Sequence, residues 1–523
     1  MNKIKLTIDN LEVEVEAGST ILEASRKIGI EIPTLCYHPD LTLHGACRVC
    51  VVEDVENGDL IASCVTPVND DMKISTRSTR ARKARRKNVE LLLANHPNDC
   101  LGCDRNGTCE LQDIAHNLSI EEDDVERIRG EQKELPPDNT GPALKRDPSK
   151  CILCGRCVRI CEEVQGVSAL QFSERGFSSI VTTAFDLPQS EINCANCGQC
   201  STVCPVGAIT EISEITKVWQ ALEDDNKHVI VQTAPSIQAT IGEEFDMAPG
   251  TVVTGKMVSA LRKLGFDRVF STEFSADLTI IEEGYEFQHR LKENKKLPHI
   301  TSCCPGWVKY AEHNYPDLLE HLSTAKSPQQ MFSAIAKTYY AEKEGINPEN
   351  IFTVSIMPCT AKKFEKDREE MNVAGRKDTD AVLTTREAAR MIKEIGLQFT
   401  ELEEEEYDEL MGKATGAGTI FGTTGGVAEA AVRTVKENLT GEELERLNLG
   451  FRGVNEAEVE IKDRTIRVAI ANGLKNASRL LDEVRNGKSD YDFIEIMACP
   501  HGCVGGGGQP LPADNVKKDK RGK

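Results

Sequence analysis

The sequence lacks any long hydrophobic run: none of its 523 residues lies in a stretch approaching the roughly 18 uninterrupted apolar residues of a membrane-spanning helix. It also lacks a cationic, apolar leader, because residues 3–8 (KIKLTI) alternate polar and apolar side chains and predict a β-strand. Positive charge is in deficit, since 63 Lys and Arg against 84 Asp and Glu leave a net charge of −21. We therefore expect a cytoplasmic protein with no membrane span and no nucleic-acid partner, since the latter requires a basic surface.

Cysteine, by contrast, is abundant and unevenly spread. Fifteen of the 20 cysteines lie within residues 36–204, and the 319 residues that follow contain only five. A disulfide scaffold is typically a short secreted chain, whereas a dense cysteine pattern in a long cytoplasmic chain more often binds metal. The composition therefore favours thiolate-bound metal over disulfides.

The length predicts three or four domains, and the texture of the sequence changes at three places. Residues 1–78 show strand alternation around a helical stretch, as in a small α+β domain. A basic helix ending near His96 opens residues 79–140, and a polar connector (130–148) leads into a compact cysteine-rich unit at 141–212. The fourth unit is expected at 225–523.

Strands alternate with helices throughout this last unit, which predicts an α/β domain with parallel sheets. Its final seven residues, KKDKRGK, are polar and are expected to be mobile. The strands are predicted at 229–233, 268–270, 354–357, 467–472 and 493–497.

The first cysteine set combines a loop with one distant member: Cys36, Cys47, Cys50 and Cys64. Three thiolates on a loop plus one distant thiolate is how a plant-type ferredoxin holds a [2Fe–2S] cluster, although the spacing here differs from the usual one. Structural zinc also takes four thiolates and remains an alternative. His38 or His44 could replace one thiolate, although each is better interpreted as a plain loop histidine.

The second set contains one imidazole and three thiols: His96, Cys100, Cys103 and Cys109. The spacing H-x3-C-x2-C-x5-C suits either zinc or a [4Fe–4S] cluster. An iron–sulfur cluster with one neutral ligand would be less negative than one with four thiolates, which raises its reduction potential.

The third and fourth sets repeat one pattern, C-x2-C-x2-C-x3-C, which is the signature of a two-cluster bacterial ferredoxin. In that arrangement the fourth cysteine of each run ligates the other cluster. Glu162 replaces the proline that usually follows the first run, and this should alter the local turn more than the ligation. We therefore predict two [4Fe–4S] sites, one held by Cys151, Cys154, Cys157 and Cys204, the other by Cys194, Cys197, Cys200 and Cys161.

The last five cysteines lie in three separated loops: TSCCPGW (301–307), MPCTAKKFE (357–365) and MACPHGC (497–503), the last followed by GGGGQP. Two of these loops directly follow predicted strands, and ligands bind at the carboxyl ends of strands in open α/β sheets. The four upstream sets resemble an electron relay, which requires a site that consumes or supplies electrons. Five thiols exceed the four that one cubane needs.

These three loops resemble the signature loops of the [FeFe]-hydrogenases, and the resemblance extends through all four upstream sets. It implies a ferredoxin-like β-grasp domain at 1–78, a small helical cluster domain, a two-cluster ferredoxin domain and a two-lobed α/β domain that binds an H-cluster. The H-cluster is a [4Fe–4S] cubane joined to a diiron unit with CO, CN⁻ and a dithiolate amine. The resemblance assigns the cubane to Cys304, Cys359, Cys499 and Cys503, with Cys503 bridging.

The same resemblance implies roles around the diiron unit. Cys303 would pass protons between the amine and the protein, and Lys362 would donate to a cyanide. The proton route outward would use Glu283, Glu286, Ser323 and Arg290. Packing around the diiron unit would come from Ala234, Pro235, Ser236, Gln329, Met357 and Met497.

The implied reaction is the reversible reduction of protons to H2, with one [2Fe–2S] and three [4Fe–4S] clusters carrying the electrons. Expected partners are ferredoxin or iron–sulfur and flavin subunits of an NAD(P)-linked, bifurcating or formate-linked complex, together with maturation factors for the diiron unit. Alternatives are a non-catalytic subunit, because residues 1–210 also resemble part of respiratory NADH dehydrogenase, a hydrogen sensor and a hydrogenase-like assembly factor. His501 stands where the family usually has glycine, and could hydrogen-bond a cluster sulfur.

Overall fold

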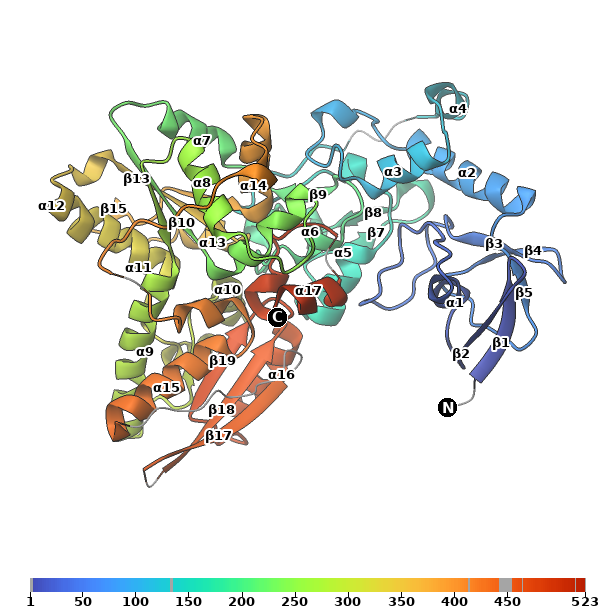
Figure 1. The fold of residues 1–523 in the computed structure, drawn as a ribbon. Coiled ribbons are helices and arrows are strands. Elements are labelled where there is room, and N and C mark those ends of the chain that lie inside the picture. Colours follow the sequence, from blue (N-terminus) through green and yellow to red (C-terminus); the bar gives the residue numbers. More distant parts are fainter. Residues whose placement is uncertain are drawn as a thin grey trace.

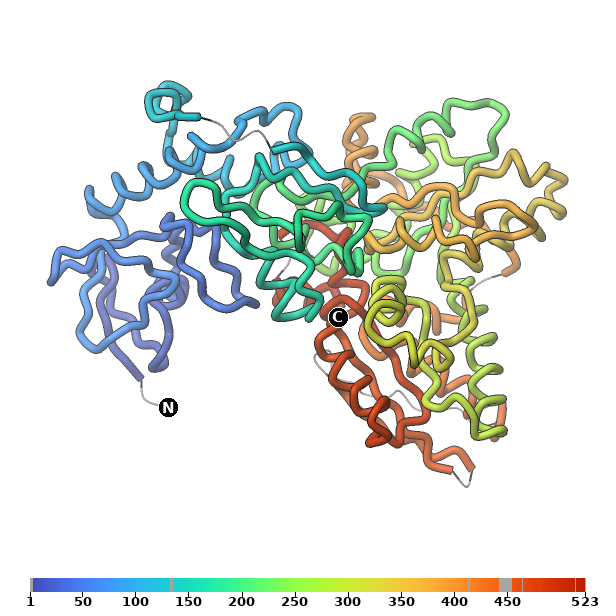
Figure 2. Tube along the Cα trace, turned by 180° about the vertical axis from the view of Figure 1, so that it is seen from behind, coloured from blue at the N-terminus to red at the C-terminus, as the bar shows by residue number. Residues whose placement is uncertain are grey.

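The computed structural model describes residues 3–131, 135–412, 414–441, 454–462, 464–512 and 514–522. Figure 1 shows the N-terminal sheet at one end, the cysteine-rich units in the middle and two further sheets at the other end. The C-terminus returns to the middle of the molecule, as both views show (Figures 1 and 2). Among the described helices, none is long and apolar enough to cross a membrane.

The N-terminal domain is a five-stranded sheet in the order β2-β1-β5-β3-β4, with α1 packed against it. Apolar residues at alternate positions of β1, such as Leu6 and Ile8, enter its core. Thr20 caps α1 through a capping box with Glu23. The predicted small α+β domain is therefore present. Its elements are β1 (Lys3–Ile8), β2 (Leu11–Glu16), α1 (Ile21–Lys27), β3 (Val51–Asp54), β4 (Asp59–Ala62) and β5 (Lys73–Ser75).

The middle of the chain contains the helical unit and the cysteine-rich unit. The start of the predicted connector includes residues 132–134, which lie outside the described residues, and its end forms a strand that pairs with β9. The helices are α2 (Thr79–Ala94), α3 (Glu110–Asn117), α4 (Glu122–Glu126), α5 (Arg156–Arg159) and α6 (Gln199–Val203), and the strands are β6 (Leu144–Arg146), β7 (Gln171–Ser173), β8 (Ile180–Thr182) and β9 (Ile209–Glu211).

The C-terminal region contains two four-stranded sheets, one for each of the two lobes that the resemblance implied. The first has the order β11-β10-β13-β16 and is parallel throughout. Its members are β10 (His228–Thr233), β11 (Arg268–Ser271), β13 (Ile351–Met357) and β16 (Ala381–Thr384).

The second sheet is parallel except at one edge. Its order is β12-β19-β18-β17, and β17 runs antiparallel to β18 at the edge because the two strands follow one another in the chain and pair as a hairpin. The other pairs are parallel. Its members are β12 (His299–Ile300), β17 (Val454–Ile461), β18 (Arg464–Asn472) and β19 (Phe493–Met497), and the short hairpin β14 (Asn372–Val373) and β15 (Arg376–Lys377) stands apart from both sheets.

Helices cover both sheets and fill the space between them. The longest, α9, packs against α11 and α15, so it lies between the two lobes (Figure 1). The remaining helices are α7 (Ile215–Leu222), α8 (Thr254–Lys263), α9 (Glu273–Glu293), α10 (Pro305–Asn314), α11 (Pro328–Ile335), α12 (Ala341–Glu344), α13 (Ala361–Glu365), α14 (Thr385–Glu394), α15 (Gly426–Thr440), α16 (Leu474–Arg485) and α17 (Asn515–Arg521).

The described part of the C-terminal tail is helical, contrary to the prediction of a mobile tail. Residues 515–521 form α17, in which Lys518 and Arg521 are buried. Arg521 pairs with Glu243, and the backbone N–H of Asn515 donates to Asp40 of the N-terminal domain. Polar composition suggested that the tail lies in solvent, but Arg521 pairs with a buried glutamate, which composition does not reveal.

A buried ion pair joins the cysteine-rich unit to the first lobe. Nη2 of Arg386 lies 2.7 Å from Oε2 of Glu211, and its Nε lies 3.2 Å from Oε1. Arg386 also donates to the carbonyls of Gln509 and Gly507. Burial alone would raise the pKa of Glu211, but the charges of Arg386 and Arg390 hold it well below its usual range.

Replacing Glu211 with glutamine is expected to lower the free energy of unfolding by about 3 kcal/mol near neutral pH, since Arg386 then stays buried without its counter-charge. A carboxylate with a lowered pKa stabilises the fold above its ordinary pKa of about 4.3 and loses that contribution as the pH falls. The difference between wild type and variant should therefore shrink in acid. Denaturant unfolding at several pH values measures it; an equal loss in the exposed control Glu12→Gln would contradict the prediction.

Candidate functional site

Four thiols of the N-terminal domain meet in its interior. Cys36 lies within hydrogen-bonding reach of Cys47 and Cys64, and Cys64 within reach of Cys50. All four cysteines are buried. The two histidines considered as ligands are engaged elsewhere: His38 Nδ1 accepts the backbone N–H of Asp40, and the ring of His44 stacks on Phe172. The donor set in the structure therefore consists of four thiols.

The second predicted set contains an unpaired nitrogen. His96 is buried, its Nδ1 accepts the backbone N–H of Asn98, and its Nε2 has no hydrogen-bond partner among the described residues. A buried polar atom without a partner is costly, and a metal would satisfy it. Cys103 Sγ lies against Gly207, where a Cβ would come within 2.6 Å of the sulfur. This contact places the second set beside the cysteine-rich unit.

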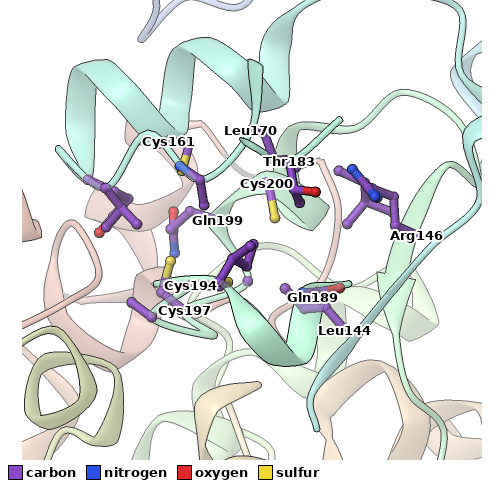
Figure 3. Close-up of a pocket in the computed structure, with 17 residues that line it drawn as sticks. Leu144, Arg146, Cys161, Leu170, Thr183, Gln189, Cys194, Cys197, Gln199 and Cys200 are labelled. Carbon is purple, nitrogen blue, oxygen red and sulfur yellow. The ribbon is translucent and has the colours of Figure 1, made fainter. Parts of the chain in front are cut away.

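The cysteines of the two ferredoxin-like runs line two cavities, and each cavity has cysteines from both runs. One cavity is lined by Cys161 together with the first three cysteines of the other run, and Figure 3 shows their sulfurs around it. A second cavity is lined by Cys204 and the first three cysteines of its opposite run. The structure thus brings together Cys194, Cys197, Cys200 and Cys161, and separately Cys151, Cys154, Cys157 and Cys204.

Both runs share one backbone conformation. Leu153 and Asn196 each have φ of 55°, and the following glycines, Gly155 and Gly198, have φ of 70° and 72°. This left-handed region suits glycine because it has no Cβ. The runs differ where the sequence differs: the first continues past Glu162 as a π-helical turn (Ile160–Val164), whereas the second ends its helix at Val203, before Pro205.

The second run contacts the glycine-rich loop of the C-terminal region. A Cβ on Gly507 would lie 2.3 Å from the carbonyl oxygen of Cys197 and 2.7 Å from Cα of Gly198. Thr360 Oγ1 donates to the carbonyl of Asn196 at 2.7 Å, beside Cys359. Glycine is therefore required at 507, because any side chain would push the two loops apart.

The three cysteine loops of the C-terminal region surround one cavity of about 80 Å³ at the ends of β10, β13 and β19. Its wall is almost entirely apolar, with one ammonium group. Every residue that the resemblance places around the diiron unit lines it: Ala234, Pro235, Ser236, Cys303, Gln329, Met357, Lys362 and Met497. Three predicted cubane ligands also line it, Cys304, Cys359 and Cys503, and Cys499 lies behind them near Cys197.

The thiols in this cavity are strongly perturbed. Burial, reinforced by the neighbouring Cys304, raises the pKa of Cys359 to about 12. Burial and Cys359 raise the pKa of Cys503 to about 12 as well. Four thiolates this close and this buried need positive charge to coexist, and an iron–sulfur core supplies it. The donor set therefore fits a metal cluster.

Lys362 remains charged in this apolar wall because of a partner that the sequence reasoning missed. Burial lowers the pKa of Lys362, but Glu365 more than compensates, with oxygens 2.9 and 3.1 Å from Nζ. Glu365 also accepts from Ser327 and Gln329. Lys362 Nζ donates in addition to the carbonyl of Cys303. The motif AKKFE contained this glutamate, and its i, i+3 spacing from Lys362 was the available signal.

The predicted proton-route residues lie on α9 and the loop before α11. Glu286 accepts from Arg290 at 2.5 Å and from Ser323 at 3.2 Å, and its side chain is partly exposed. Glu283, one turn away, is buried and close enough to Cys303 that its charge, together with burial, raises the pKa of that thiol. The structure gives no hydrogen bond between Glu283 and Glu286 among the described residues.

His501 faces away from the cluster loops, which corrects the suggested bond to a cluster sulfur. Its Nε2 lies 2.9 Å from Oδ1 of Asn515, and its Nδ1 lies 3.1 Å from Oδ1 of Asp519. Both nitrogens therefore contact α17. Its φ of 65° explains why glycine is the simpler residue here. The histidine instead attaches the C-terminal helix to the Cys499–Cys503 loop.

Comparisons with known families divide the chain in the same order. Residues 227–507 match the iron only hydrogenase large subunit, C-terminal domain. Residues 1–79 match a 2Fe-2S iron-sulfur cluster binding domain. Residues 85–124 match the NADH-ubiquinone oxidoreductase-G iron-sulfur binding region, and residues 141–210 match the ferredoxin-like domain of NADH-quinone oxidoreductase subunit 3.

Similar proteins extend over nearly the whole chain. The NADP-reducing hydrogenase subunit HndD of Solidesulfovibrio fructosivorans is 47% identical, over 100% of this chain and 91% of the relative. Iron hydrogenase 1 of Clostridium pasteurianum is 41% identical, over 98% and 90%. Among solved structures, a variant of the apo [FeFe]-hydrogenase HydA1 from Chlamydomonas reinhardtii aligns with a TM-score of 0.55 and 42% identity, covering 59% of this chain and 87% of that one.

Proposed function

Because this chain belongs to the iron-only, or [FeFe], hydrogenase family and is a hydrogenase, we propose that its apolar cavity holds an H-cluster. Cys304, Cys359, Cys499 and Cys503 would hold the cubane, with Cys503 shared with the diiron unit. When bound, this group supplies the reversible heterolytic chemistry of H2. The observation that carries the proposal is the convergence of three distant cysteine loops and one buried ammonium on a single cavity.

The remaining cavity residues would orient the cluster and exclude water. Lys362, held as an ammonium by Glu365, would donate to an anionic ligand. Gln329 Oε1 is buried without a hydrogen-bond partner among the described residues, so it is free to accept from the bound group. Met357 and Met497 would pack softly around it.

Protons are proposed to enter and leave through Cys303. Its thiol would exchange a proton with Glu283, and Glu286, Ser323 and Arg290 would continue the route to solvent. The hydrogen bonds of Glu286 with Ser323 and Arg290, and its partial exposure, support this outer half. The charge of Glu283 at Cys303 supports the inner half.

Electrons are proposed to pass through one [2Fe–2S] and three [4Fe–4S] clusters. The four-thiol set of residues 36–64 would hold the first, and His96 with three cysteines would hold a [4Fe–4S] cluster through Nε2. The two crossed sets would hold the others. The set around Cys197 lies nearest the catalytic loops, so it is the last step before the cavity.

The partner is proposed to be a further electron-carrying subunit. The name of the 47% identical relative, a subunit of an NADP-reducing hydrogenase, supports an iron–sulfur or flavin subunit linked to a nicotinamide. Soluble ferredoxin is the other donor consistent with the cluster chain. H2 and protons are the substrates, and installation of the diiron unit would require maturation factors.

Infrared spectroscopy of the matured protein tests the cofactor directly. We expect bands from iron-bound CO and CN⁻ together with H2 evolution. Cys503→Ala should remove both, while the signals of the upstream clusters persist in electron paramagnetic resonance. Matured protein that evolves H2 but gives no such bands would overturn the H-cluster assignment.

A further inference from the structure

A buried histidine lies beside the central carboxylate of the proposed proton route, and nothing above assigns it a role. His299 on β12 is fully buried, and its Nε2 lies 3.6 Å from Oε1 of Glu283, which is 1% exposed. Neither ring nitrogen of His299 has a hydrogen-bond partner among the described residues, nor does Oε2 of Glu283. Two titratable groups thus face one another, and together they carry three polar atoms without a hydrogen-bond partner among the described residues.

Such an arrangement is costly unless a proton is shared. Buried polar groups are normally hydrogen-bonded, and a buried carboxylate needs a counter-charge. The gap of 3.6 Å lies just outside hydrogen-bond length, so a shift of a few tenths of an ångström would close it. Either a carboxylic acid beside a neutral imidazole or a carboxylate beside an imidazolium would then satisfy the pair.

The packing holds the imidazole in this position. The rings of Phe287 and Phe493 lie 5.7 and 5.4 Å from the imidazole, centroid to centroid, on the neighbouring elements α9 and β19. The backbone N–H of His299 donates to the carbonyl of Asp492 at 2.8 Å. The apolar rings exclude water, so Glu283 is the nearest group with which the imidazole can exchange a proton.

The other charged groups around the pair belong to the same region. Glu286 lies on the same helix as Glu283, and burial would raise its pKa, but the Thr324 N–H and the charges of Arg290 and His299 bring it below its usual value. On β19, burial raises the pKa of Glu495 to about 7, and Glu283 adds to that shift. The carboxylate of Asp492 is paired with Arg464. The two arginines here are each paired with a carboxylate, Arg290 with Glu286 and Arg464 with Asp492, so His299 is the base that faces Glu283.

We propose that His299 is the proton-holding partner of Glu283, so that the two form one relay between Cys303 and Glu286. The O–H bond of the Glu283 carboxylic acid breaks and an N–H bond forms at Nε2 of His299, which leaves a carboxylate and an imidazolium. The imidazolium then returns or passes on that proton, and no electron is transferred. This inference rests on the proposed function, because it takes the Cys303–Glu283 route as its frame.

The test uses His299→Gln, which keeps a polar group that does not titrate, and His299→Phe, which keeps the ring between Phe287 and Phe493. Without the imidazole, Glu283 loses the neighbouring base that can take its proton. We expect its infrared carboxyl band, assigned by its loss in Glu283→Gln, to persist at higher pH than in wild type. The rate of H2 oxidation, which needs Glu283 to release its proton, should fall about tenfold in matured protein.

Two controls separate the possible failures. His289→Gln removes an exposed histidine of α9, which is paired with Glu293, and should leave both the band and the rate unchanged. If Glu283→Gln itself turns over like wild type, the proposed proton route fails. If Glu283→Gln is inactive while both His299 variants keep the wild-type band and rate, only the role of His299 is overturned.

Discussion

Replacing Cys303 with serine is expected to lower H2 turnover by at least about 100-fold, the scale of a lost general acid or base. Cys303 lines the cavity beside Cys304, and burial together with the charge of Glu283 raises the pKa of its thiol. A serine hydroxyl has nearly the same size but holds its proton far more tightly than a thiol. Proton exchange between the cavity and Glu283 should therefore stop, while cofactor binding continues.

The decisive readout is the exchange of H2 with solvent deuterons, because this exchange requires protons but no external electrons. We expect Cys303→Ser to lose both exchange and turnover and to keep the infrared bands of CO and CN⁻. Ser302→Ala is the matched control, since its hydroxyl donates to the carbonyl of Ala325 and does not line the cavity. Exchange at the wild-type rate in the Cys303 variant would refute the proton role of this thiol.

The local part of this molecule could be predicted from the sequence. Cysteine spacing alone identified the two crossed ferredoxin sets, because the ligands of each run lie on one short turn whose geometry repeats at Gly155 and Gly198. The resemblance to the signature loops of the [FeFe]-hydrogenases identified the three loops of the cavity. The five strands predicted in the C-terminal region were also recovered, as β10, β11, β13, β18 and β19, since alternating or continuous apolar runs are a local signal.

The contacts that adjust the site are non-local and escaped prediction. His299 meets Glu283 only because β12 pairs with β19 beside α9, which no spacing in the sequence specifies. His501 has the local position of a cluster residue, but a helix 14 residues further on takes its Nε2. Sequence order predicts what a loop can bind, whereas the direction of a single side chain depends on which element packs against it.

The second large effect is expected at Cys197, where a substitution should block electron transfer and leave proton transfer intact. This residue lies in the crossed set nearest the catalytic loops, where the carbonyl of Cys197 and Gly198 touch Gly507. The pKa of Cys499 is raised first by burial, then by Cys359, and then by Cys197, so the sulfurs of Cys197 and Cys499 lie close together. Loss of a ligand here should interrupt the electron path at its last step, whichever upstream cluster receives the electron.

Cys197→Ser is therefore expected to lower H2 evolution from a protein electron donor by at least about 100-fold. The reason is that all electrons pass through this cluster, whose reduction potential depends on its ligands. Exchange of H2 with deuterons should remain, which is the opposite of the result expected for Cys303→Ser. Cys100→Ser, in the outer set with His96, is the matched control. It removes a ligand of the same type from a cluster that is not the last one before the cavity. If Cys197→Ser evolved H2 at the wild-type rate, electrons would have to reach the cavity by a path that bypasses the contact at Gly507.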